Sequence, residues 1–142
     1  MATPKRIPFD FVLEELSSLR PRTKPMFGCT AVYVDDKIVL ILRDRDKFPK
    51  DNGVWLATTE VHHTSLRKVF PSMRSIGLFG VPVTGWQVLP EDAPDFEKSV
   101  SKACRLILQG DPRIGKIPGS RSKEVRREAQ QKIVRWKDLQ RP

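Results

Sequence analysis

The apolar residues of this chain fall into runs whose spacing predicts strands in some places and helices in others. Between Met26 and Arg43, two runs of β-branched and apolar residues flank the acidic pair Asp35-Asp36, which favours a tight turn. This pattern predicts an antiparallel β-hairpin. We expect the hairpin to begin a sheet on which the rest of the chain packs.

The alternation of side chains along this predicted hairpin places apolar residues on both of its faces. With a two-residue turn, one face carries the pairs Val34–Lys37, Val32–Val39 and Thr30–Ile41, and the other carries Tyr33–Ile38, Ala31–Leu40 and Cys29–Leu42. A sheet with one face in water would instead alternate apolar with polar residues. We therefore expect both faces to be covered. Helices would cover one, and either more of this chain or a second copy, in a homodimer through the hairpin, would cover the other.

The remaining patterns complete an α+β order. Helical stripes of apolar residues predict helices at 8–19, from Thr64 or Ser65 onward, and at 95–109. Further strands are predicted at 54–59, 73–79 and 83–89, whereas residues 20–25 are predicted to be a basic connector. The order α-β-β-β-α-β-β-α predicts a mainly antiparallel, five-stranded sheet packed with helices.

A change in composition after residue 110 predicts three regions. Residues 1–110 form the α+β domain, residues 111–122 form a linker rich in Pro, Gly and Ser, and residues 123–142 form a basic amphipathic helix. The apolar stripe of that helix consists of Val125, Ala129, Ile133 and Trp136.

The net charge of +9 is concentrated towards the C-terminus. Residues 111–142 carry ten Lys or Arg against four Asp or Glu, a net charge of +6, whereas residues 1–110 carry sixteen against thirteen, a net charge of +3. The basic side chains around the stripe are Arg121, Lys123, Arg126, Arg127, Lys132, Arg135 and Lys137. Three hypotheses remain for this segment: it docks on the domain or on a second subunit, it binds nucleic acid through phosphates, or it is mostly disordered.

Length and composition favour a single domain in a reducing compartment. A chain of 142 residues suits one domain, and two cysteines make no disulfide framework. No apolar run approaches the length of a membrane helix, and the first residues lack the apolar core of a secretory signal. These features predict a cytoplasmic protein that does not cross a membrane.

Several residues resemble a known family. The first predicted helix is followed by Met26-Phe27-Gly28 and an apolar hairpin that contains Tyr33, and a late strand at 86–93 leads into the last helix. This arrangement, over roughly residues 9–110, resembles the N-terminal domain of the TfoX/Sxy family of bacterial competence regulators. The resemblance implies a small α+β fold in the bacterial cytoplasm, and the family supplies no catalytic residues to carry over.

Four features invite a chemical interpretation, and each has a simpler one. Gly110 to Lys116 matches part of a phosphate-binding loop but follows a helix and lacks the Ser or Thr that binds Mg²⁺. His62 and His63 are expected to lie on the surface without a third metal ligand, and Cys29 and Cys104 are expected to be buried hydrophobes. Asp44 and Asp46 belong to a solvated charge run.

The sequence thus predicts no catalytic residue, no metal and no cofactor. We expect a non-enzymatic regulatory or protein-interaction module with an unidentified protein partner. The alternative is a nucleic-acid-binding protein that uses the basic C-terminal residues.

Overall fold

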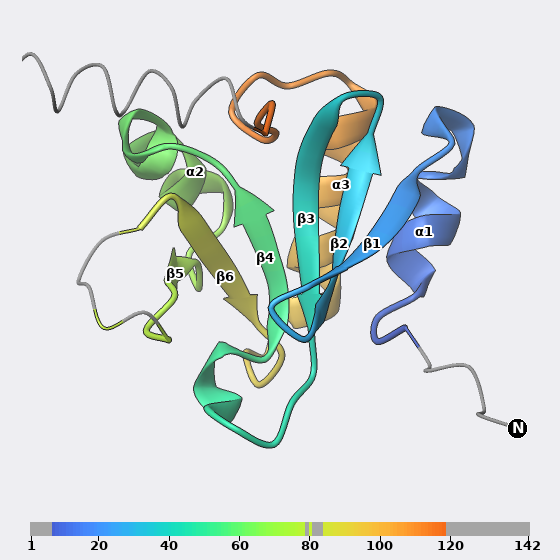
Figure 1. Ribbon diagram of the computed structural model, residues 1–142. Helices are drawn as coiled ribbons and strands as arrows, with labels where there is room; N and C mark the ends of the chain where they lie inside the picture. Colours follow the sequence, from blue (N-terminus) through green and yellow to red (C-terminus); the bar gives the residue numbers. More distant parts are fainter. Residues whose placement is uncertain (1–6, 79, 81–83, 119–142) are drawn as a thin grey trace, which may run out of the picture.

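An antiparallel sheet of six strands organises the structure, a computed structural model that describes residues 7–78, 80 and 84–118 (Figure 1). The strands lie in the order β1-β2-β3-β4-β6-β5, and every neighbouring pair is antiparallel. Their bounds are β1 Arg22–Met26, β2 Cys29–Val34, β3 Lys37–Arg43, β4 Gly53–Ala57, β5 Arg74–Ser75 and β6 Trp86–Pro90. The predicted α+β class is confirmed.

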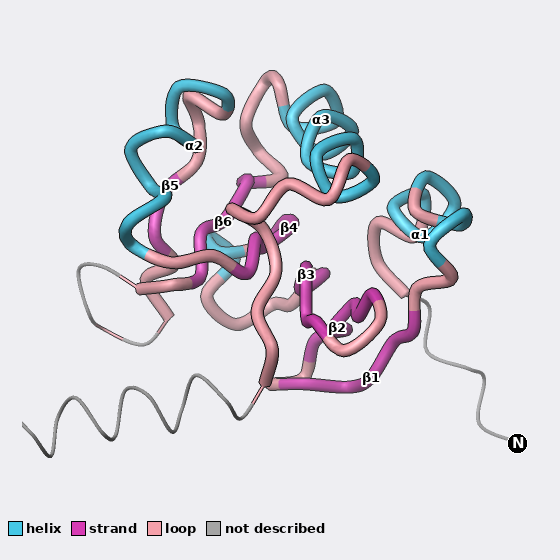
Figure 2. Tube along the Cα trace, turned by 90° about the horizontal axis from the view of Figure 1, so that it is seen from above, coloured by secondary structure: helices cyan, strands magenta, loops and turns pink. Residues whose placement is uncertain are grey.

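Among the described residues, three helices lie on one side of this sheet (Figure 2). They are α1 Phe11–Glu15, α2 His63–Val69 and α3 Phe96–Leu108, and short 3₁₀ turns occupy Ser17–Leu19, Pro49–Asp51 and Glu60–His62. Helices α1 and α3 contact each other. The rings of Phe9 and Phe96 lie edge to face with centroids 5.2 Å apart, and Ser101 Oγ donates to Glu15 Oε1 over 3.0 Å. Their contact closes one end of the helical layer.

The structure corrects several predicted boundaries. The basic connector at 20–25 is largely a strand, β1, because its polar residues pair with β2 at the exposed edge of the sheet, where no apolar alternation is needed. The strand predicted at 73–79 is reduced to β5, and the following strand, β6, begins at Trp86. The helix predicted at 8–19 is split into α1 and a 3₁₀ turn at Ser17–Leu19.

The predicted hairpin register is correct beside the turn and incorrect farther from it. Tyr33 lies opposite Ile38 as expected, but Val32 lies opposite Leu40 because Val39 is the extra residue of a β-bulge. From that point every partner on β3 moves by one, so Ala31 faces Ile41. The bulge lets two consecutive residues of β3, Val39 and Leu40, both pack on the helical side.

Apolar cores lie on both faces of the sheet, as the sequence predicts. The helix-side core joins residues of the strands to α1, α2 and α3, including Val12, Val32, Leu42, Leu66 and Val100. The opposite core consists of Cys29, Ala31, Tyr33, Ile38, Ile41, Trp55, Ala57, Ile76 and Val88, and their exposures run from 0% to 9%. The second face of the hairpin is therefore covered within a single chain.

Part of the predicted linker packs on the domain. Residues 111–118 run over one end of the sheet from the helical side (Figure 2), and we call them the strap. Lys116 exchanges two backbone hydrogen bonds with Ile38, of 2.8 and 2.9 Å, and Gly115 N donates to Ala57 O over 2.7 Å. Ile114 is only 4% exposed. The strap thus lies between β3 and β4, while the predicted basic helix at 123–142 falls outside the described residues.

The part of the chain that the structure describes holds no helix that is long and apolar enough to span a lipid bilayer.

Candidate functional site

Two exposed phenylalanines lie on loops at one end of the sheet. Phe27 stands in the turn between β1 and β2 and is 54% exposed, and Phe48 stands in the loop between β3 and β4 and is 42% exposed. Both loops lie at the lower end of the sheet in Figure 1. We call Phe27, Arg43, Arg45, Phe48 and Asn52 the aromatic end.

Both phenylalanines adopt a left-handed backbone conformation. The φ angle is 54° at Phe27 and 51° at Phe48, a region that costs a residue with a Cβ about 1–2 kcal/mol. Gly28 follows with a φ of 71°, so the turn requires positive φ at both central positions, where Asn-Gly or Asp-Gly is usual. Phe27 therefore places a large ring at a position where the backbone conformation favours a small polar residue.

A buried arginine holds the loop that carries Phe48. Arg43 is 2% exposed, and its guanidinium donates to Phe48 O and Asn52 Oδ1 over 2.8 Å each and to Lys47 O over 2.5 Å. Among the described residues Arg43 has no carboxylate partner, and its Nε has no acceptor. Since a buried cation is costly without such bonds, the loop conformation and the arginine depend on each other.

A second arginine joins this loop to the turn at Phe27. Arg45 donates from Nη1 to Phe27 O over 3.1 Å, and its own backbone exchanges two bonds with the Asn52 side chain, of 2.9 and 2.8 Å. A Cβ on Gly28 would fall 1.6 Å from that same Nη1. The glycine of the Met-Phe-Gly sequence thus leaves room for Arg45, which would clash with any side chain at this position of the turn.

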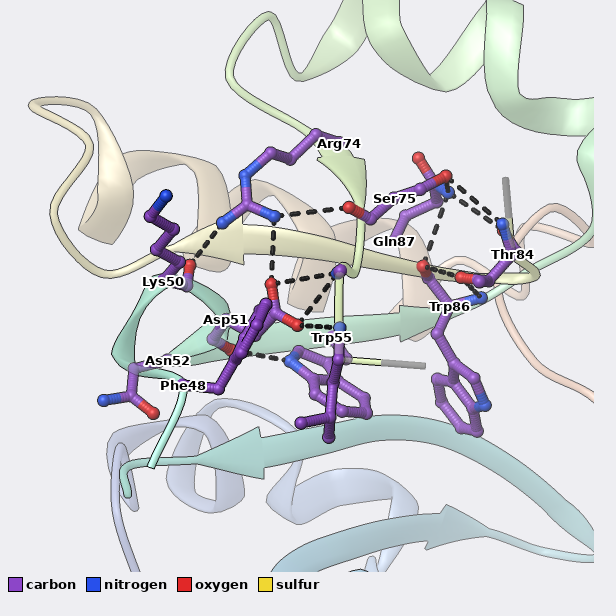
Figure 3. A network of polar contacts seen from close by, with 12 residues as sticks. Phe48, Lys50, Asp51, Asn52, Trp55, Arg74, Ser75, Thr84, Trp86 and Gln87 are labelled. Atoms are coloured by element: carbon purple, nitrogen blue, oxygen red, sulfur yellow. Dashed lines mark hydrogen bonds and ion pairs between the residues drawn. The ribbon is translucent and has the colours of Figure 1, made fainter. Parts of the chain in front are cut away.

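The same loop is fastened to the β5 segment by a fully buried carboxylate (Figure 3). Asp51 accepts from the backbone N–H of Gly77 and of Leu78, at 2.9 and 2.8 Å, and from Arg74 Nη1 at 3.0 Å. Its backbone carbonyl accepts from Trp55 Nε1 over 2.8 Å. The Asp51 carboxylate therefore has a structural role. Together with Arg43 it fixes the loop that carries Phe48 from both sides.

The cysteines are held as thiols. Burial raises the pKa of Cys29 more than the charges of Arg43 and Arg45 lower it. Burial and the nearby Glu15 raise the pKa of Cys104 to about 12. Both side chains are buried, as predicted, and neither has the lowered pKa that a nucleophilic cysteine needs.

A groove of about 880 Å³ opens beside the aromatic end. It is lined by Ile7, Pro8, Thr23, Lys24, Pro25, Gly28, Cys29, Thr30, Leu42, Asp44, Arg45, Asp46 and Lys47. Charged residues of both signs line it, and Asp44 and Asp46 are exposed there, as expected for a solvated run. The groove could receive a side chain or a loop of a partner.

The other predicted candidates have structural positions or lie elsewhere. His63 is 3% exposed, which corrects the prediction of a surface histidine, because it opens α2 and turns inward from the end of β4. Gly110 and the following residues form a turn after α3, in which Arg113 pairs with Asp111 over 2.7 Å. The described ranges contain no group of three or more His, Cys, Asp or Glu able to hold a metal ion.

The seven basic residues predicted to contact nucleic acid, from Arg121 to Lys137, all lie outside the described residues. No motif in the sequence points to Phe48 or Arg43 as a functional residue. One signal was present at Phe27, where an aromatic residue precedes glycine in a hairpin turn.

Comparisons with known proteins leave the family open. No family model, no curated protein and no solved structure matches the chain. The resemblance to the TfoX/Sxy N-terminal domain stays a prediction.

Proposed function

We propose that this protein is a non-enzymatic regulatory or protein-interaction module of the TfoX N-terminal type, which acts in the bacterial cytoplasm and contacts a protein partner with its aromatic end. The observation that carries the proposal is the pair of exposed phenylalanines in left-handed backbone, Phe27 and Phe48. Conformational strain of this kind gathers at functional sites, where it is part of the mechanism.

The geometry suits a binding surface. The two phenylalanine carbonyls are held by Arg45 and Arg43, so little conformational freedom is lost when a partner covers the rings. Buried aromatic anchors often contribute 2 kcal/mol or more to an interface. The adjoining groove offers room for the partner's own side chains.

The substitution Phe27→Asn separates function from folding. Asn-Gly is favoured in this kind of turn, so the variant should unfold at the same or a higher temperature, with a gain of about 1 kcal/mol at most. Loss of the ring should weaken partner binding by a factor of about 30, the equivalent of about 2 kcal/mol. Affinity capture by the full chain, followed by titration of the captured partner, measures the second effect, and thermal melts measure the first.

The control is Val61→Asn, which removes an apolar side chain that is 82% exposed in the Glu60–His62 turn. The proposal predicts that this variant and the wild type retain the same partner with the same affinity. Equal retention by the Phe27 variant would show that the aromatic end is not the contact surface.

Homodimerisation through the Met26–Arg43 hairpin is a separate part of the proposal. Because most of the side chains on both hairpin faces are buried, a second copy would meet the outer edge of β1, whose residues are exposed, and the turn at Phe27. Sedimentation equilibrium over a hundredfold concentration range measures the association, and a constant monomer mass throughout would reject it.

Nucleic acid is the second candidate partner, and the distribution of charge favours it. The described residues carry sixteen Lys or Arg and fourteen Asp or Glu, a net charge of +2. The remaining +7 of the total of +9 belongs to residues 1–6 and 119–142. Such an asymmetry is typical of a neutral carrier with a basic arm.

The salt dependence of binding tests this candidate. If the basic C-terminal residues contact phosphates, replacing Arg121, Lys123, Arg126, Arg127, Lys132, Arg135 and Lys137 by Gln in the full chain should flatten the plot of log affinity against log salt. Each lost phosphate contact reduces the slope by about 0.7 for single strands and about 0.9 for duplex DNA. An unchanged slope would remove these residues from the interface.

A further inference from the structure

The strand β1 forms one edge of the sheet, and its backbone groups alternate between β2 and the outside. In a hairpin with a two-residue turn, the positions beside the turn exchange hydrogen bonds, and so does every second pair beyond them. Met26 and Cys29 hold the positions beside the turn in this hairpin. The positions between the bonded ones face outward, and they are Pro25, Thr23 and Pro21, which precedes the strand.

Two of these three outward positions have no N–H group. Proline cannot donate to a ladder, so in sheets it is confined to edge strands, where the missing N–H would face solvent. Pro25 and Thr23 are exposed, and Pro21 is partly exposed. A strand that approached this edge would find an outward N–H at Thr23 and at neither of the flanking positions, so a continuous ladder could not form.

The charges of β1 oppose pairing with a second copy in particular. Both Arg22 and Lys24 are exposed. An antiparallel pair of β1 strands centred on Thr23 would place Arg22 directly across from Lys24 of the second copy, and Pro21 across from Pro25 of the second copy. Like charges directly opposite each other are destabilising, and two facing prolines supply no N–H to the ladder. The sequence Pro-Arg-Thr-Lys-Pro is thus unsuited to self-pairing.

The opposite edge of the sheet, β5, is occupied by contacts within the chain. The backbone carbonyl of Ser75 accepts from Arg74 Nη1 over 3.2 Å. Beyond the strand, the N–H groups of Gly77 and Leu78 donate to the Asp51 carboxylate over 2.9 and 2.8 Å. β5 is also only two residues long, and very short edge strands offer little to another chain. Among the described strands, β1 is therefore the edge that another strand could reach.

We infer that Pro21, Pro25 and the cations between them close the β1 edge to strand addition, so that neither a second copy of this chain nor an extended peptide continues the sheet. An open edge would present a row of unpaired N–H and C=O groups, which is a template for pairing and aggregation. The inference does not rest on the proposed partner of the aromatic end. It narrows the proposed homodimer, since a second copy at the hairpin would be held by side chains rather than by a shared backbone ladder.

A triple variant tests the edge by restoring what it lacks. Pro21→Val and Pro25→Val return the two outward N–H groups, and Lys24→Glu places a carboxylate across from Arg22 of a second copy. The matched control makes the same changes at exposed positions outside the strands, namely Pro71→Val, Pro94→Val and Lys98→Glu. The triple variant and its control therefore carry the same net charge.

Sedimentation equilibrium of each full chain, over a hundredfold concentration range, measures self-association. We expect the triple variant to associate at least about thirtyfold more tightly than the wild type, because a strand pair centred on Thr23 would gain four backbone hydrogen bonds, each favouring association about twofold or more. The control should behave as the wild type does. Adding Thr23→Pro to the triple variant should abolish the gain, since it removes an outward N–H that the pairing with β2 does not use.

A triple variant that associates no more tightly than the control would overturn the inference. A wild-type dimer that Thr23→Pro disrupts would also overturn it, because that dimer would use the β1 edge as it stands. A wild-type dimer that keeps its affinity in Thr23→Pro would support the inference and assign the contact to side chains. Thermal melts show whether each variant remains folded. If the triple variant unfolds, Pro25→Val alone should associate more tightly than Pro94→Val alone, and equal association would again overturn the inference.

Discussion

Among the described residues, phenylalanine accounts for three of the five positions other than glycine that have positive φ. At Phe9 the ring packs against Phe96 of α3, and this tertiary contact offsets the cost of the strained backbone. Phe27 and Phe48 are 54% and 42% exposed, so burial within the chain offsets less of the cost of their strained backbone. The difference separates a structural phenylalanine from two that a partner could cover.

His63 is a second residue whose surroundings change its chemical properties. It is 3% exposed, and its Nε2 has no hydrogen-bond partner in the described structure. Burial, followed by the charge of Arg67, lowers the pKa of His63, and Lys116 and His62 act in the same direction, whereas Glu60 opposes them. The folded protein therefore favours a neutral imidazole.

The lowered pKa of His63 makes the free energy of unfolding depend on pH, with a definite sign. The unfolded chain takes up a proton at His63 near its ordinary pKa, about 6.5, while the folded chain resists protonation until a lower pH. The free energy of unfolding should fall as the pH drops below about 6.5, by up to about 1.4 kcal/mol per pH unit for this one group. Urea titrations of the wild type and of His63→Leu between pH 5 and 7.5 measure it.

The variant should show a shallower slope in that window, and the control His62→Gln should keep the slope of the wild type. A slope that His63→Leu leaves unchanged would assign the effect to other groups.

At the scale of elements, the strap takes the place of a missing stretch of strand pairing. β3 and β4 pair only from Leu40 to Arg43 and from Gly53 to Leu56, and beyond that point the strap supplies the partner for Ile38. It also places Ile114 in the helix-side core. The strap therefore belongs to the folded unit.

Truncation of the buried side chain of the strap should show how much the strap contributes to the free energy of unfolding. Ile114→Ala should lower the free energy of unfolding by about 2–4 kcal/mol, because the side chain is 4% exposed in a packed core. Ile117→Ala, at a position that is 43% exposed, should cost clearly less. Chemical denaturation compares the two, and equal losses would mean that the strap is not anchored by Ile114.

At the scale of the whole molecule, two apolar cores share the central strands. β2, β3 and β4 contribute side chains to both cores, so neither can form without the same backbone pairing. Asp51 and Arg74 add a polar link between the β3–β4 loop and the β5 edge. Such sharing favours cooperative unfolding of the domain.

A fluorescence experiment tests that cooperativity. With Trp86 and Trp136 replaced by Phe, Trp55 reports on the core opposite the helices, where it is fully buried. Its fluorescence and the far-ultraviolet circular dichroism should give coincident denaturation curves. A fluorescence transition at lower denaturant would show that this second core opens separately.

The sequence by itself determined the features that depend on local pattern. The Asp35-Asp36 turn, the apolar runs of β2 and β3, and the helical stripe of α3 are all read from neighbouring residues, and together they predict the α+β class and two covered faces. The exposed run at Asp44 and the buried cysteines follow from the same reasoning.

Only the tertiary structure decided the features that depend on residues far apart in the chain. The polar edge strand β1 gains its conformation from pairing with β2, the bulge at Val39 from the demands of two cores, and the strap from an open place beside Ile38. The aromatic end likewise depends on Arg43 and Arg45 meeting carbonyls of separate loops. Hydrogen bonds and packing between distant segments leave no periodic trace in the sequence, which is why these features appear only once the chain is folded.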